Sequence, residues 1–198
     1  AACVSVHGAN RLGTNSLLDI VVFGKRAGES MLEYVSKTKS TSISDSAADD
    51  LVNKINNLIE KEHTDEFSVG RIRNDLQESM EENAKIFRSE ETLSKQTEIL
   101  ENLRERYENV TIFDKGKVFN TELMEAIELD YLLDMSESTV ASALARKESR
   151  GAHSRQDFPD RDDGNFMKHS FAFKNGNSAN LRYKDVELGK YEPMERKY

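Results

Sequence analysis

Apolar residues recur every three or four positions along residues 44–145, the spacing that places them on one face of a helix. Four such stripes follow one another and predict four amphipathic helices. Each helix would bury a face about 100° wide against the others, which predicts an antiparallel helical bundle. The stripes are Leu51, Ile55, Leu58 and Ile59; Ile72, Leu76 and Met80; Leu93, Thr97, Leu100, Leu103 and Tyr107; and Leu123, Ile127, Tyr131, Val140 and Leu144. We assign them to core packing and give them no catalytic role.

A further helix is predicted before the bundle. The apolar run 17–23 follows Asn15 and Ser16, either of which can act as its N-cap, and the helix should extend to about residue 35. The Ser-, Thr- and Lys-rich segment 36–46 then predicts a linker. Residues 2–6, at the start of the chain, are typical of a buried strand.

The last fifty residues follow a different pattern. Residues 148–163 alternate in charge and contain Pro159, which disfavours a helix, so they predict an extended loop. We interpret Arg150 and His153 in this loop as structural, because ion-paired arginines in loops commonly are. Alternation over 166–173 and 181–186, around Asn175, Gly176 and Asn177, predicts a β-hairpin.

Charge and composition narrow the classes of function. The 198 residues carry a net charge of −8, and residues 40–110 alone hold nine basic and seventeen acidic residues. An acidic surface of this kind argues against a nucleic-acid partner. One cysteine rules out an internal disulfide, and together with four scattered histidines it predicts no metal site. The longest apolar run is too short to span a bilayer.

The segment 7–19, HGANRLGTNSLLD, carries the candidate chemistry. Gly8 and Gly13 allow a loop whose amides approach a ligand closely, and Asn10 and Asn15 also tolerate left-handed geometry. The Arg11 guanidinium is a planar fork that matches a carboxylate. The helix start after it favours a second negative charge. A plainer alternative is a glycine turn whose arginine pairs with Asp19.

Two stretches resemble one known family. The words CVSVHGANRLGTNSLLDIVVFGKRAG and ESRGAHSRQDFPDRDD are similar to the flavoprotein subunit of succinate dehydrogenase and of its sister, fumarate reductase. They occur in the family's order, and the resemblance spans essentially the whole chain. It implies that Arg11 binds a carboxylate of succinate or fumarate, and that Asn15, Ser16 and Leu17 contact FAD. It implies no catalytic residue within this chain.

The same resemblance implies a reaction and its partners. Two hydrogens leave adjacent carbons of succinate, one as hydride to the flavin and one as a proton to a base. The electrons would pass to an iron–sulfur subunit and through it to a membrane anchor, because this sequence has no cluster ligands. The expected location is the cytoplasmic face of a bacterial inner membrane or the mitochondrial matrix side. The extended loop would lie against the flavin domain, near the substrate.

The family's glycine-rich dinucleotide fingerprint does not occur in this sequence. We therefore expect a C-terminal piece of the subunit that is inactive alone. Its fold class would be mainly α: the end of an FAD-binding domain in 1–36, an antiparallel helical bundle in 37–147, and a loop with a short β-hairpin tail in 148–198.

Three alternatives stay open. Fumarate reductase uses the same site in the opposite direction, and L-aspartate oxidase shares the general form of the loop. The chain could instead be a helical docking module without catalysis, and flavin content would discriminate this module from an enzyme.

Overall fold

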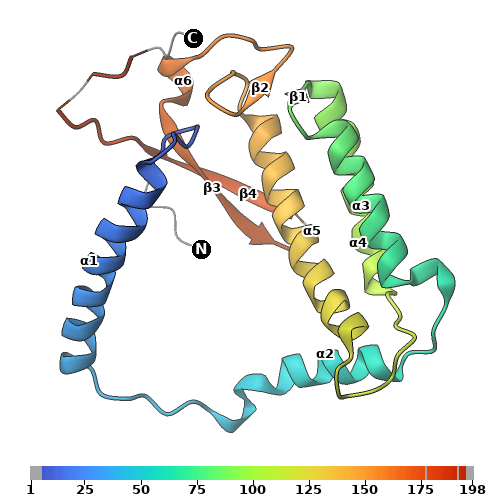
Figure 1. Cartoon of the computed structure of the whole chain (residues 1–198). Helices are drawn as coiled ribbons and strands as arrows, with labels where there is room; N and C mark the ends of the chain where they lie inside the picture. The colour runs from blue at the N-terminus through green and yellow to red at the C-terminus, as the bar shows by residue number, and fades with distance from the viewer. Residues whose placement is uncertain (1–5, 177, 191, 195–198) are drawn as a thin grey trace.

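The structure is a computed structural model that describes residues 6–176, 178–190 and 192–194. It is mainly helical and ends in an antiparallel hairpin (Figure 1). The helices are α1 (Asn15–Lys37), α2 (Asp49–Glu60), α3 (Val69–Asn83), α4 (Glu90–Glu108), α5 (Thr121–Ala145) and the short α6 (Asp163–Phe166), with 3-10 turns η1 (Asp45–Ala48) and η2 (Asp65–Phe67). The strands are β1 (Phe87–Arg88), β2 (Ser154–Arg155), β3 (Lys168–Asn175) and β4 (Ser178–Asp185).

Helix α4 runs antiparallel to both α3 and α5, and α2 lies across the lower end of the three (Figure 1). The predicted bundle is thereby confirmed. Side chains from all four helices and from the segments beside them form one apolar core. Its most deeply buried members are Val69, Ile72, Leu93, Leu103, Val110, Ile112, Ala126, Leu129, Leu133 and Val140.

The predicted apolar stripes match the observed burial in α4 better than in α5. In α4, Leu93, Leu100 and Leu103 are buried as expected. In α5 the predicted stripe is partly wrong, because Tyr131 is exposed whereas Leu129 is completely buried. Helix α5 contacts α3 and α4 as well as both strands of the hairpin, so its apolar residues are distributed around it and mark no single face.

Helix α1 stands apart from the bundle, joined to it by the segment 38–44 (Figure 1). It has no buried residue. It begins one or two residues earlier than predicted, with Thr14 rather than Asn15 or Ser16 as the N-cap, and the Thr14 side chain makes no capping bond. The strand predicted over 2–6 lies outside the described residues apart from Val6, which is exposed and belongs to no strand.

The tail folds back onto the bundle. Strands β3 and β4 form the predicted hairpin, which turns at Gly176 and packs against α5. Between α5 and β3, residues 146–162 form the predicted extended loop, and β2 in that loop pairs in parallel with β1, which precedes α4. None of the helices within the described ranges combines the length and the apolarity needed to cross a bilayer.

Candidate functional site

The loop that carries Arg11, residues 7–14, turns through its two glycines. Gly8 and Gly13 have positive φ values of +60° and +30°, whereas Asn10 and Asn15 do not adopt the left-handed geometry that the sequence also allowed. The Arg11 side chain is exposed. The Asp19 carboxylate accepts a hydrogen bond from His7 Nε2 at 2.9 Å, and no ion pair of Arg11 is found over the described residues. The plainer alternative, an Arg11–Asp19 pair, is therefore wrong.

The first turn of α1 follows this loop directly and holds Asn15, Ser16 and Leu17. Leu17 donates its N–H to the Thr14 carbonyl at 3.0 Å, so the turn starts tightly. The Ser16 hydroxyl is buried, yet it has no hydrogen-bond partner within the described part of the chain. An unpaired buried hydroxyl costs about 1–3 kcal/mol, which a polar ligand at this turn would recover.

The Arg11 loop rests on the extended loop after α5. Ala152 donates its N–H to the Ala9 carbonyl at 3.1 Å. An open pocket of about 640 Å³ lies beside this contact. Its walls include His7 and Asn10 from the first loop, and Arg150 and Arg161 from the second. The structure thus joins two segments that the sequence separates by about 140 residues.

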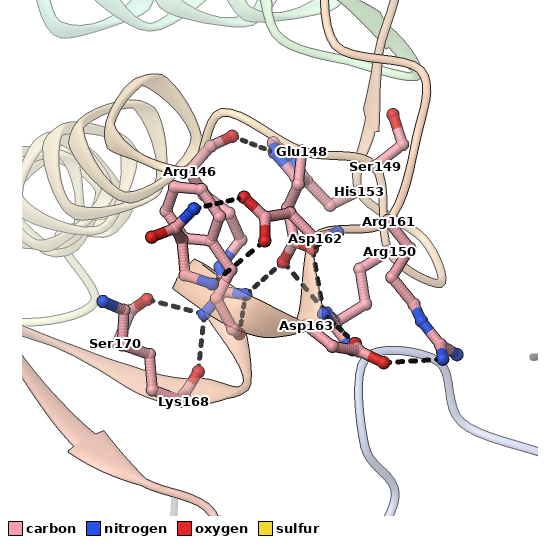
Figure 2. A network of polar contacts seen from close by, with 12 residues as sticks. Arg146, Glu148, Ser149, Arg150, His153, Arg161, Asp162, Asp163, Lys168 and Ser170 are labelled. Carbon is pink, nitrogen blue, oxygen red and sulfur yellow. Dashed lines mark hydrogen bonds and ion pairs between the residues drawn. The ribbon is translucent and has the colours of Figure 1, made fainter. Parts of the chain in front are cut away.

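Four charged side chains fix the second loop; we call Arg146, Glu148, Arg150 and Asp163 the Glu148 cluster (Figure 2). The Glu148 carboxylate is completely buried at its centre. Arg150 donates to both of its oxygens at 2.9 Å, and Arg146 donates to one of them at 2.5 Å. Arg150 also donates to Asp163 at 2.7 Å.

The electrostatics of this cluster favour the ionised acid. Burial alone would raise the pKa of Glu148, but hydrogen bonds from Arg150, from the Asp162 backbone and from Arg146 outweigh it. The pKa of Glu148 therefore lies below its usual value, and the carboxylate is charged at neutral pH. Sequence analysis missed Glu148; an acid between Arg146 and Arg150 was the signal that pointed to it.

His153 has a defined tautomer in the same loop. Its Nδ1 accepts from Arg88 Nη1 at 3.0 Å, so its Nε2 carries the hydrogen and donates to the Arg146 carbonyl at 3.0 Å. Burial lowers the pKa of His153, and the nearby cations Arg88, Arg155 and Arg146 lower it further, which keeps the ring neutral. Arg150 and His153 are thus held by the contacts expected of structural residues.

Arg155 completes the attachment of the loop to the bundle. Its fully buried guanidinium donates to both oxygens of Asp157 at 2.8 Å and to Glu90 on α4 at 2.9 Å. Further donations reach the carbonyls of Ala143 and Leu144 at the end of α5. The hydrogen bonds from Arg155 lower the pKa of Asp157 below its usual range.

A larger pocket, about 780 Å³, lies between α2, α4 and α5. Arg104 at its base is paired with Asp130 and Asp134 at 2.6 Å and with Glu137 at 2.9 Å. Lys54 in turn pairs with Asp130. Arg104 and Lys54 are thus already neutralised by acids among the described residues, so the pocket is the weaker candidate for an anion site.

Comparisons with known proteins identify the family to which the chain is similar. Residues 73–198 match the family described as the C-terminal part of the fumarate reductase flavoprotein. The succinate dehydrogenase flavoprotein subunit of Rickettsia bellii is 40% identical over 190 residues, which cover 95% of this chain and 32% of that protein. The fumarate reductase flavoprotein subunit of Haemophilus influenzae is 39% identical over 200 residues, with 100% and 33% covered.

A solved structure extends the likeness to three dimensions. The chain superposes on the FrdA chain of Escherichia coli quinol fumarate reductase with a TM-score of 0.89 and 37% identity. The match covers 98% of this chain and 34% of that one. The chain therefore spans about a third of the length of the relatives that it matches.

Proposed function

The chain belongs to the succinate dehydrogenase and fumarate reductase flavoprotein family, and we propose that it is the C-terminal third of such a subunit. The proposed reaction is the interconversion of succinate and fumarate, in the oxidative direction as a succinate dehydrogenase. Relatives of both kinds are about equally similar to the chain, so fumarate reduction at the same site is the second candidate. The single observation that carries this proposal is that Arg11 is exposed and has no ion-pair partner among the described residues.

Arg11 would bind and orient one carboxylate of the substrate. Its guanidinium presents two parallel donors to a carboxylate, and no described acid of the chain competes for them. Holding one end of a four-carbon diacid fixes where its central carbons lie relative to the oxidant. Arg11 therefore contributes to binding and orientation, and proton transfer belongs to a residue outside this chain.

The first turn of α1 fits the cofactor that the family name implies. FAD, when bound, supplies the two-electron chemistry of the reaction. The buried Ser16 hydroxyl has no partner among the described residues, and no side chain caps the turn, so this hydroxyl can donate to a polar ring edge. Leu17 is exposed beside them and offers an apolar surface. We propose that Asn15, Ser16 and Leu17 hold the flavin, and that the turn favours negative charge on it.

The proposal extends to organisation and partners. Residues 1–36 would complete an FAD-binding domain, 37–147 form the bundle, and 148–198 tie the two together. Electrons would leave through an iron–sulfur subunit attached to a membrane anchor, at the cytoplasmic face of a bacterial inner membrane or in the mitochondrial matrix.

The test is Arg11→Ala in the complete subunit within its complex. We expect turnover of succinate to fall about a hundredfold or more, with FAD content unchanged, because the substrate carboxylate loses its charged partner. Arg26→Ala, an exposed arginine on α1, is the matched control and should leave both quantities unchanged. Normal succinate oxidation by the Arg11 variant would overturn the assignment.

A further inference from the structure

The contact between the two loops has no room for a side chain. A Cβ on Gly151 would lie 2.5 Å from the Ala9 carbonyl oxygen and 2.8 Å from the Ala9 Cβ. Gly151 also has a φ of +59°, which disfavours any other residue. The backbone at position 151 therefore packs directly against the backbone of the Arg11 loop, two residues before Arg11.

The turn that contains Gly151 is held on both sides. Arg150 donates its N–H to the His153 carbonyl at 2.8 Å, and His153 donates its N–H back to the Arg150 carbonyl at 3.0 Å. The Arg150 side chain is fixed by the buried Glu148, and the His153 ring is fixed between Arg88 and the Arg146 carbonyl. The tip formed by Gly151 and Ala152 is thus anchored to the bundle through side chains that are themselves hydrogen-bonded within the chain.

The other partner in the contact is less constrained by its own packing. Helix α1, which continues from the Arg11 loop, contains no buried residue, and Ala9 and Arg11 are exposed. Of two surfaces in contact, the one with the more deeply packed support sets the position of the other. The direction of support therefore runs from the bundle, through Gly151, to Arg11.

We propose that Gly151 is a positioning residue for substrate binding: it sets the place of the Arg11 loop through its contact with Ala9. This inference rests on the proposed role of Arg11. It gives the loop at 148–163 a task in recognising the dicarboxylate, although none of its side chains need touch the substrate. A displacement of about 1 Å at Arg11 is enough to weaken a bidentate contact markedly.

The experiment is Gly151→Ala in the complete subunit within its complex. We expect the KM for succinate and the dissociation constant for malonate, a dicarboxylate probe, both to rise about tenfold, with FAD content unchanged. Saturating succinate should restore most of the turnover, because the weakened contact is a binding contact. A merely structural role would instead reduce the active fraction, lower kcat and leave KM unchanged, and that result overturns the proposal.

Gly176→Ala is the matched control. Gly176 has nearly the same φ, +61°, but lies in the hairpin turn with nothing within 4 Å of its would-be Cβ. The two variants share the backbone strain and differ in the contact with Ala9. An equal rise in KM for both would show that strain, rather than the contact, is responsible, and would refute the inference.

A second variant changes Ala9, the exposed partner in the same contact. Ala9→Val enlarges the loop at residue 9 without changing the packed turn at Gly151, so it tests the contact even where Gly151→Ala does not fold. We expect KM to rise and hydrogen exchange of amides 7–14 to quicken, while exchange in α4 stays constant. An unchanged KM with this variant contradicts the proposal.

A double variant separates this inference from the proposed function. In an Arg11→Ala background, Gly151→Ala should weaken malonate binding no further, since its effect passes through Arg11. If Arg11→Ala leaves malonate binding intact, the proposed function fails. If Arg11→Ala abolishes binding but Gly151→Ala leaves KM unchanged, the positioning role alone fails.

Discussion

Two regions of the molecule differ in how their side chains are buried and paired. The first is the bundle with its extended loop, and the second is the Arg11 loop with α1. In the first, Ile72, Leu93 and Leu129 are completely buried and the arginines of the loop are paired. In the second, a 23-residue helix has no buried residue, and its Leu17, Leu18 and Ile20 are each more than 60% exposed. Residues that fix the fold are satisfied within the chain, whereas the residues proposed to bind ligands are left with unsatisfied groups.

The largest expected difference between the two regions is in the stability lost when a charged side chain is neutralised. Glu148→Gln should destabilise the protein by about 3 kcal/mol, because it leaves two guanidinium groups, Arg146 and Arg150, largely buried without their carboxylate. Glu29→Gln removes a carboxylate from the exposed Lys25–Glu29 pair on α1 and should cost less than about 0.5 kcal/mol. Urea unfolding midpoints measure both. Similar shifts for the two variants would erase the contrast.

A smaller difference should follow from deleting apolar side chains. Leu129→Ala opens a cavity in a completely buried site of α5 and should cost about 2–3 kcal/mol. Leu32→Ala on α1 changes a side chain that is 74% exposed, so its effect should stay within about 0.5 kcal/mol. The same unfolding measurements compare them, and an equal loss from Leu32→Ala would mean that α1 is packed in solution.

The smallest expected effect is a dependence on pH that arises in the extended loop. The pKa of His153 is lowered in the folded protein, so the unfolded chain binds its proton first as the pH falls. Its contribution to stability is complete above about pH 6.5 and is lost below it, by at most about 1.4 kcal/mol per pH unit.

His153→Asn should flatten this part of the pH profile, since an amide does not titrate there. The further loss in more acidic solution, from Glu148 and Asp157 with their lowered pKa values, should persist in the variant. Thermal unfolding between pH 5 and 8 measures the slope. An undiminished slope in the variant would assign the effect to another group.

Sequence patterns predicted the elements whose environment is one-sided. Helix α4 packs through one face, so its period of three to four residues identified Leu93, Leu100 and Leu103 correctly. Helix α5 is contacted on several sides, so the same rule misplaced Tyr131. The rule fails there because burial depends on neighbours that the local sequence does not specify.

The candidate site likewise combines features that the local sequence indicates with a contact that it does not indicate. The turns at Gly8 and Gly13 and the exposed Arg11 are local features, and the sequence indicated them. The contact of Gly151 with Ala9 joins residues far apart in the chain, so no spacing or composition could reveal it. The roles of Arg11, Asn15, Ser16 and Leu17 stay predictions until the variants are measured.

The hydrogen bond between Ala152 and Ala9 also has a topological consequence. The chain leaves this point at residue 9 and returns to it at residue 152, so α1 and the four-helix bundle together form a loop closed at these two residues. The entropy of closing such a loop grows slowly, by about 0.6 kcal/mol for each doubling of a flexible length. Insertions or deletions in the exposed 38–44 segment can therefore accumulate during evolution without moving the two ends apart.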